Sequence, residues 1–288
     1  MKQLIAISFG LFANLIFAQN ALYNQGNLQI HPNGSIGFHT NFINDASFDQ
    51  HIGLAGFYGN SPIQVSGNVA PSLWDAEFFF PNNVMFRIPV HVQNNTNFVD
   101  GNVDSPLDDQ TVYLNFMQNG FFTGERNGAK ITGFAAINNR DFFSFPIGDE
   151  NQLRPLTLNS QGSTPFARCA YLFENPSNPI SLTTSFDVNN KVSDIGTVTD
   201  REFWILNSGV PAAVTISWNA RSDLASIPNA SFESIIVVGW SIAANQWVVI
   251  GNAAKGGDIT NGFITSEVFN PNDFGAITFG TIPLPTDT

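Results

Sequence analysis

Four aspartates crowd one short stretch of the chain, FVDGNVDSPLDDQ, at Asp100, Asp104, Asp108 and Asp109. Carboxylate oxygens on a loop are the ligands that calcium prefers, and about six to eight oxygens complete its coordination. The spacing does not follow the EF-hand loop, and the glutamate that closes that loop is missing. A calcium site and a solvated acidic loop both remain open, and calcium is the only cofactor that these residues suggest.

The remaining reactive side chains form no recognisable catalytic motif. Cys169 is the single cysteine, and its apolar neighbours in PFARCAYLF favour a buried structural thiol. The four histidines lie in the first half, at His31, His39, His51 and His91. Their spacing does not place two imidazoles on one face of an expected element, as a zinc site would require.

Hydrolase signatures are absent from the sequence, which has no G-x-S-x-G elbow, H-E-x-x-H helix or glycine-rich phosphate loop. We therefore expect a protein that is not an enzyme. A glycan-acting hydrolase with paired carboxylates is the enzymatic alternative.

Tryptophan side chains offer a further kind of site, because flat rings stack on sugars. The five are Trp74, Trp204, Trp218, Trp240 and Trp247. Most of them sit in alternating strands, where core packing is the default. A carbohydrate-binding face nevertheless stays open as an alternative.

The most distinctive segment is FPIGDENQLRPLTL, residues 145–158. A strand is expected to end at Pro146, and Gly148 and Asp149 to turn the chain. Arg154, before Pro155, would open the next strand and pair with Asp149 or Glu150 across the turn. We interpret the segment as a structural staple at a domain junction, with a ligand site as the alternative.

The chain opens with an export signal, so the candidate residues described above are expected to lie outside the cytoplasm. Lys2 precedes an apolar run from Leu4 to Phe17, and Ala18 offers a small residue for cleavage. The run is short for a bilayer, which needs about 20 residues, so residues 1–18 are predicted to be a signal peptide. No transmembrane segment is expected in the mature chain.

Composition also limits the expected binding partners. The formal net charge is -12, and clusters of Lys and Arg are lacking, so nucleic acid is not an expected partner. Aromatic residues make up 13% of the chain, which is not the composition of a disordered protein.

Strand patterns run throughout, while sustained helical spacing is absent. In the first half, short strands alternate with Asn- and Gly-rich corners such as YGNS, PNNV and QNNTN. Such corners suit stacked coils in which Asn side chains bond to neighbouring corners, which favours a short β-solenoid; an irregular β-sandwich is the rival. The later strands AVTISW, IIVVGW and QWVVIG alternate cleanly and predict an antiparallel β-sandwich.

The sequence thus predicts an all-β protein, with a solenoid-like or irregular β domain at residues 19–150 and a β-sandwich at 151–281. The polar, Pro-rich residues 282–288 are expected to form a linker or tail.

Several segments resemble large surface proteins of Bacteroidetes, especially flavobacteria, that leave the cell through the type IX secretion system. FSFPIGDENQLRPLTL resembles their F-P-V-G-D and R-P-L motif. REFWILNSGVPAAVTISWNARSDL, IIVVGWSIAANQWVVIGN and VFNPNDFGAITFG resemble the module before the gliding-motility-associated C-terminal (type B) sorting domain, and the opening LYNQGNLQIHPNGSIGFHTNFINDASFDQHIGLAGFYG resembles their N-termini. Together these segments cover most of the mature chain.

The resemblance implies a secreted, cell-surface or extracellular location, passage through the type IX machinery, and no catalytic residue. Such proteins usually continue into a sorting domain with a T-P-N-G-D-G-x-N-D-like stretch, which this sequence lacks before Thr288. We expect that a longer protein has been shortened there.

The leading hypothesis is a structural or adhesive surface module associated with gliding motility or attachment. Its expected partners are the secretion machinery, outer-membrane or surface proteins, or polysaccharide. A carbohydrate-binding module is the first alternative, and the hydrolase is the second.

Overall fold

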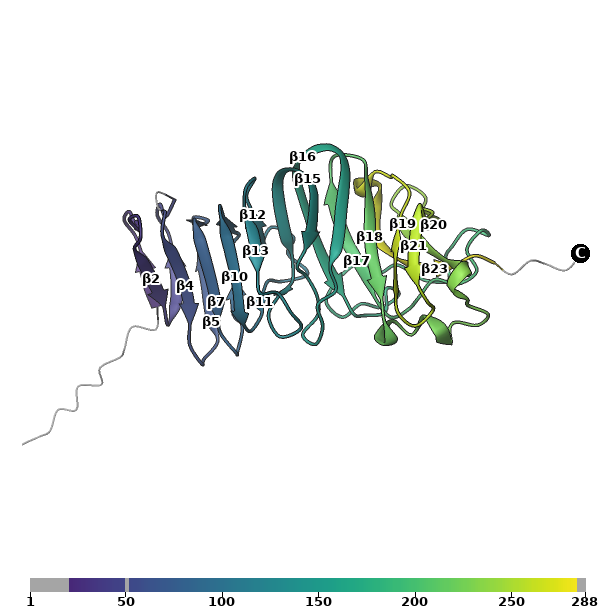
Figure 1. Ribbon diagram of the computed structural model, residues 1–288, viewed down its shortest axis with the longest axis horizontal. Helices are drawn as coiled ribbons and strands as arrows, with labels where there is room; N and C mark the ends of the chain where they lie inside the picture. Colours follow the sequence, from purple (N-terminus) through teal and green to yellow (C-terminus); the bar gives the residue numbers. More distant parts are fainter. Residues whose placement is uncertain (1–20, 50–51, 284–288) are drawn as a thin grey trace, which may run out of the picture.

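A computed structural model describes residues 21–49 and 52–283. The expected signal peptide at residues 1–18, His51 and most of the 282–288 tail lie outside the described residues. The chain is all-β, as predicted, and Figure 1 shows an elongated body with its first strands stacked along the long axis.

The first half is a β-solenoid of about five turns, which confirms the prediction. The chain visits three parallel sheets in turn. The first contains β1 (Ala21–Asn24), β3 (Asn41–Asn44), β5 (Ile63–Gly67), β8 (Val84–Phe86), β11 (Val103–Asp104) and β14 (Ile131–Thr132). The second contains β2 (Ser35–Phe38), β4 (Leu54–Tyr58), β7 (Asp75–Phe79), β10 (Asn95–Asp100) and β13 (Phe121–Thr123). The third contains β6 (Ser72–Leu73), β9 (Val90–Val92), β12 (Leu114–Phe116) and β15 (Ala135–Phe145).

Variable coil length explains why the sequence shows no strict repeat. Ala21 pairs with Asn41, 20 residues later, whereas Val103 pairs with Ile131, 28 residues later. Each coil nevertheless places an inward side chain over the one before it, because parallel strands in register align equivalent positions.

Phenylalanine rings make the most regular of these internal stacks. The ring centroids of Phe38 and Phe57 are 4.9 Å apart, and those of Phe57 and Phe78 are 5.1 Å apart. Phe98 continues the column at 6.1 Å from Phe78. All four rings are buried, so each coil adds one large apolar side chain to the core.

Asparagine side chains bond between neighbouring coils at one corner, as the corner composition predicts. Asn24 Nδ2 donates to Asn44 Oδ1 at 2.7 Å, and Asn44 Nδ2 donates to the Val69 carbonyl at 2.7 Å. Gly67 has a φ of +125°, and a Cβ there would lie 2.2 Å from the Asn44 carbonyl oxygen. Only glycine therefore allows the third coil to approach this corner.

The second half is antiparallel and forms the predicted sandwich around β16 (Leu156–Leu172). One end of β16 pairs with β18, the other end pairs with β17, and β15 runs along the opposite edge. The layer through β17 continues to β23, β19 and β20, and the layer through β18 continues to β22 and β21. These strands are β17 (Phe203–Ser208), β18 (Ala212–Trp218), β19 (Ile235–Ser241), β20 (Gln246–Val249), β21 (Ala254–Gly257), β22 (Gly262–Thr265) and β23 (Phe274–Thr281).

The junction contains one of the longest strands of the chain. Residues 135–145 form the single strand β15. Polar residues such as Asn138 lie in its middle, where the register with β16 shifts between Arg140 and Phe142 before the pairing resumes. The four 3-10 turns in the described chain are short: Ala220–Ser222, Leu224–Ser226, Phe232–Ser234 and Pro271–Asp273.

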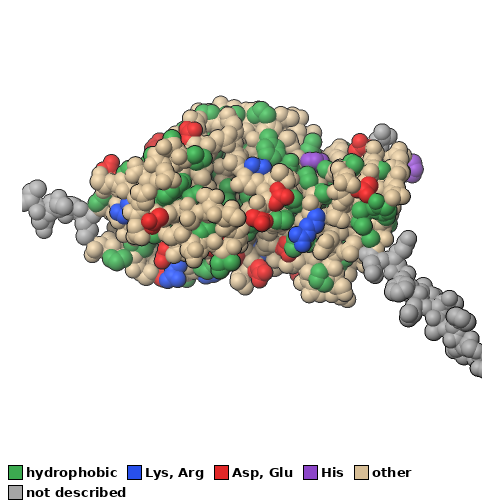
Figure 2. All heavy atoms as spheres, turned by 180° about the vertical axis from the view of Figure 1, so that it is seen from behind, with side chains coloured by type: hydrophobic (Ala, Val, Ile, Leu, Met, Phe, Trp, Pro, Cys, Tyr) green, Lys and Arg blue, Asp and Glu red, His purple; other side chains and the backbone are tan. Residues whose placement is uncertain are grey.

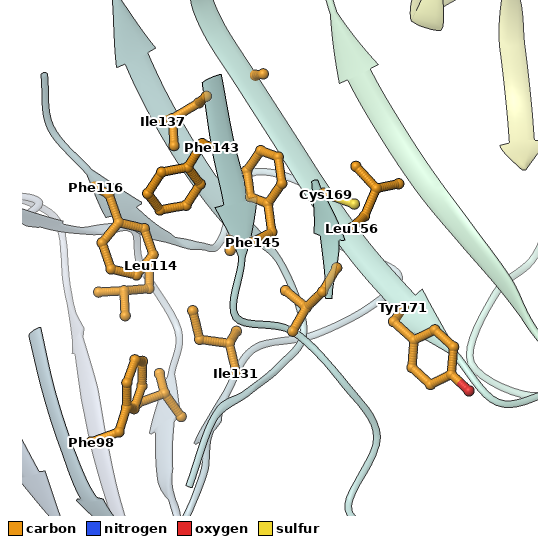
Figure 3. Close-up of a cluster of buried hydrophobic side chains, with 14 of the residues drawn as sticks. Phe98, Leu114, Phe116, Ile131, Ile137, Phe143, Phe145, Leu156, Cys169 and Tyr171 are labelled. Carbon is orange, nitrogen blue, oxygen red and sulfur yellow. The ribbon is translucent and has the colours of Figure 1, made fainter. Parts of the chain in front are cut away.

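One hydrophobic core continues through both halves. Figure 3 shows Phe98 and Phe116 from the coils in the same buried cluster as Phe143 of β15 and Cys169 of β16. The Phe116 and Phe143 ring centroids are 5.1 Å apart. The expected division at residue 150 is therefore crossed by both the third sheet and the core.

A second cluster covers the opposite face of the sandwich. Phe186, from the irregular segment between β16 and β17, packs edge-on against Phe203 and Trp240. This segment therefore closes a sheet face that would otherwise expose a large apolar area.

The asparagine corner supplies a direct stability test. Replacing Asn44 with Ala removes its hydrogen bonds with the Asn24 amide and the Val69 carbonyl, while Asn24 Nδ2 keeps the carbonyls of Ala46 and Ser47 as acceptors. Because two hydrogen bonds are lost, the free energy of unfolding should fall by about 2 kcal/mol. Urea denaturation measures this change. The control is Asn60→Ala in an exposed corner, which should cost less than about 0.5 kcal/mol; an equal loss in both variants would refute the role of the corner.

Candidate functional site

The candidate site is the junction between coils and sandwich, built around residues 145–158. Pro146 follows β15 directly, and Gly148 and Asp149 turn the chain before Leu153 returns to pair with Gly148. Asp149 Oδ1 accepts the Gln152 amide at 2.8 Å, which closes the turn. A Cβ on Gly148 would lie 2.0 Å from the Gln152 carbonyl oxygen, so the turn requires glycine.

The predicted pairing of Arg154 with Asp149 or Glu150 is wrong. Arg154 pairs with Glu202, at the start of β17, through Nη2 to Oε2 at 2.6 Å and Nε to Oε2 at 3.2 Å. Pro155 carries the chain straight into β16, so Arg154 points into the sandwich rather than back across the turn. Both side chains are almost fully buried, with 3% and 1% exposure.

Neutral partners complete this buried pair. The Tyr171 hydroxyl donates to Glu202 Oε2 at 2.6 Å, and Arg154 Nη2 donates to Ser222 Oγ at 3.0 Å. The Trp204 indole donates to the Arg154 carbonyl. Burial raises the pKa of Tyr171 well above its usual range, so the phenol remains a donor.

Asp149 has a different cationic partner, Arg221, which follows β18. Arg221 Nη1 donates to Asp149 Oδ1 at 3.0 Å, and the guanidinium lies 4.0 Å from the centre of the Phe173 ring. Burial acts to raise the pKa of Asp149, but the hydrogen bond and charge of Arg221 outweigh it and hold the pKa below its usual value.

Lys130 is the third cation at the junction, and it is fully buried. Its Nζ donates to Asn102 Oδ1 at 3.1 Å and to the carbonyls of Asn127 and Glu150. Burial lowers its pKa to about 8, although Asp149, Asp104 and Glu150 oppose the shift.

A cleft of about 500 Å³ opens beside these groups and is lined by Asp104, Asp149, Glu150 and Glu174. Asp104 Oδ2 accepts from Asn83 at 3.0 Å, and Thr132 donates to Oδ1. Burial raises the pKa of Asp104 despite these hydrogen bonds. The cleft therefore contains one carboxyl group with a raised pKa and one with a lowered pKa, but both already serve as acceptors for structural donors.

The structure does not bring the four calcium candidates together. Asp100 forms an exposed ion pair with Arg126, and Asp109 accepts the amide and hydroxyl of Thr111. Asp104 lines the cleft, while Asp108 lines a separate groove of about 640 Å³. Within residues 21–49 and 52–283, no three His, Cys, Asp or Glu side chains are placed to share a metal ion.

The other site residues considered from the sequence also lie apart from one another. Cys169 is fully buried, and burial raises the pKa of its thiol well above the usual value, so it is unsuited to nucleophilic attack. His91 contacts Asn115 Nδ2 at 2.9 Å, whereas His31 and His39 are exposed. Trp204, Trp218, Trp240 and Trp247 are buried, and Trp74 is half-buried. The four buried tryptophans therefore belong to the core and offer no exposed sugar platform.

Sequence reasoning missed Lys130, Glu202 and Arg221. A usable signal was present in REFWIL, where an acidic residue directly precedes the apolar start of a strand. A carboxylate such as Glu202 is almost never buried unless it is paired with a cation. The chain has only 11 Lys and Arg residues, so few side chains could be that partner.

Comparison with known proteins does not add a function to this geometry. The chain matches no protein-family model, no curated protein and no solved structure. The part of the chain that the structure describes contains no helix with the length and apolar character of a membrane span.

The buried pair yields a mutational prediction. Arg154→Met should lower the free energy of unfolding by about 3–5 kcal/mol, because it leaves the Glu202 charge buried without its partner. Replacing both as Arg154→Met with Glu202→Leu should recover much of that loss in urea denaturation. Arg126→Met removes an exposed ion pair and should cost less than about 1 kcal/mol; equal costs for Arg154→Met and Arg126→Met would contradict the assignment.

The lowered pKa of Lys130 leads us to predict that the stability of the fold depends on pH. Its pKa is about 8 in the folded chain and 10.5 when unperturbed, so between these values the unfolded chain binds more protons than the folded one. Stability should therefore rise with pH, by about 2 kcal/mol between about pH 8 and 9.5, relative to a Lys130→Met variant. Parallel stability profiles of the two proteins over this range would rule out the buried, depressed lysine.

Proposed function

We propose that this chain is a non-catalytic structural and adhesive module of an exported cell-surface protein. The observation that carries the proposal is the unbroken hydrogen-bonded path from β6 through β15, β16 and β17 to β20, which joins coils and sandwich. A continuous core accompanies this path. Such a body suits the role of a stiff spacer that holds a surface away from its point of attachment.

The chemistry of the candidate site supports a structural role. Glu202 is occupied by Arg154 and Tyr171, Asp149 by Arg221, and Asp104 by Asn83 and Thr132. Groups held in this way stiffen the junction, whereas a glycan hydrolase needs two carboxyl groups turned toward a substrate.

The surface composition suits exposure outside a cell. Charged residues make up 12% of the chain, and Figure 2 shows them as small spots on a face that is mostly uncharged. A polar, sparsely charged exterior of this kind favours contact with uncharged partners over nucleic acid.

The proposed export route rests on the sequence resemblance described above. The opening apolar segment would direct passage across the inner membrane, and the type IX machinery would carry the chain across the outer membrane. Outer-membrane or surface proteins and polysaccharide are the proposed partners after export.

Surface proteolysis of intact cells tests this location. In the native organism, a protease added outside the cell should remove the protein when the type IX translocon works and leave it protected when the translocon is inactivated. A cytoplasmic protein serves as the lysis control. Equal protection in both strains would contradict display by this route.

A further inference from the structure

The outer face of the second solenoid sheet contains an ordered row of side chains that neither the core nor the junction uses. Strand register aligns Gly37 with Gly56, and Gly56 with Glu77. Asn97 follows Glu77 on β10, and Thr123 follows Asn97 on β13. The five strands lie side by side in one sheet, stacked along the body as Figure 1 shows.

Tyr58 lies flat over the two glycines of this row. A Cβ on Gly56 would lie 2.1 Å from the Tyr58 hydroxyl oxygen, and one on Gly37 would lie 3.3 Å from its Cδ2. The missing side chains therefore make the space that the ring fills. The Tyr58 ring is partly exposed, and the His39 ring packs beside it with the ring centroids 5.7 Å apart.

Hydrogen bonds fix the polar members of the row. The Tyr58 hydroxyl donates to Glu77 Oε1 at 2.8 Å, and Asn97 Nδ2 donates to Glu77 Oε2 at 2.8 Å. The Thr123 hydroxyl donates to Asn97 Oδ1 at 3.2 Å. Burial and the neighbouring Glu77 raise the pKa of Tyr58 to about 12, so the phenol keeps its proton at neutral pH.

Two exposed phenylalanines flank this row. Phe79 is the register partner of Tyr58 and is 49% exposed, and Phe121 is the partner of Asn95 and is 46% exposed. Their neighbours Phe78 and Phe122 face inward, so the exposed rings occupy outward positions that usually carry polar side chains.

We propose that this row, with Phe79 and Phe121, is a binding face for a neutral polysaccharide laid across the strands. We call it the Tyr58 face. The inference rests on the adhesive role proposed above and assigns it a ligand class. Flat rings stack on the apolar faces of sugars, and fixed carboxyl, amide and hydroxyl groups meet sugar hydroxyls.

The charge of the sheet and the spacing of its strands favour a neutral polysaccharide over a charged one. The five strands of the sheet contain no Lys or Arg, and Arg126 beside β10 is already paired with Asp100, so a sulfated or uronic acid polymer finds no unpaired cation on these strands. Neighbouring strands are about 4.8 Å apart, close to the length of one hexose in an extended chain. A polymer running across the sheet therefore meets an equivalent strand position at each sugar unit.

Affinity electrophoresis of the purified full chain tests the inference. The neutral probes are hydroxyethylcellulose, xyloglucan and galactomannan, and the anionic probes are polygalacturonate and dextran sulfate. At least one neutral polymer should retard the protein, and the anionic polymers should not. Phe79→Ala and Phe121→Ala should each weaken binding about tenfold, the equivalent of one lost aromatic stacking contact.

Phe142→Ala is the matched control, because Phe142 is 60% exposed on β15, outside the Tyr58 face. It should bind as the original protein does. The exposed rings contribute little to the core, so all three variants should melt at an unchanged temperature.

Three results would each overturn the inference: no neutral polymer retards the protein, the anionic polymers bind instead, or Phe79→Ala and Phe121→Ala bind like Phe142→Ala. None of these results changes the surface proteolysis outcome, so failure of the binding face is separable from failure of the proposed export and scaffold role.

Discussion

Parallel backbone pairing between successive coils is the constraint on which the rest of the structure depends. Each coil offers unpaired amide and carbonyl groups at its edge, and a buried edge without a partner is costly. Strand β15 resolves this at one end, because it pairs in parallel with β12 and in antiparallel fashion with β16. The sandwich is therefore the cap of the solenoid, and it continues the same sheet and the same core. In this third sheet the coils therefore end without an unpaired edge at the junction, whereas β13 and β14 are the end strands of the other two sheets.

The buried charges at the junction determine how the two architectures meet. Arg154 and Glu202 are 48 residues apart in sequence, so their pairing fixes the start of β17 against the end of the coil region. Buried ion pairs contribute little net stability compared with apolar residues of similar size, because both charges must leave water. Their value here is geometric, since few other arrangements of the strands would satisfy both groups. The Asp149–Arg221 pair and the buried Lys130 add to this requirement from the turn and the last coil.

Local patterns predicted much of this fold, and long-range partners did not follow from them. Asn and Gly corners indicated stacked coils, and Asn24 and Asn44 bond across them. The repeated Gly-Phe pairs, Gly37-Phe38 and Gly56-Phe57, mark equivalent coil positions and were a readable signal for the register. The partner of Arg154 was missed because a carboxylate within the same turn is closer in sequence than Glu202. The four aspartates of one loop separate because β10 and β11 direct Asp100 and Asp104 to different sheets, which a linear spacing cannot reveal.

The central claim is that coils and sandwich form one cooperative body, and amide hydrogen exchange in increasing urea tests it most directly. Peptides from β10 and β12 should lose protection at the same urea concentration as peptides from β18 and β19, because one sheet and one core join them. Loss of protection in the coils at a clearly lower concentration, with the sandwich still protected, would show two independent domains and contradict the account.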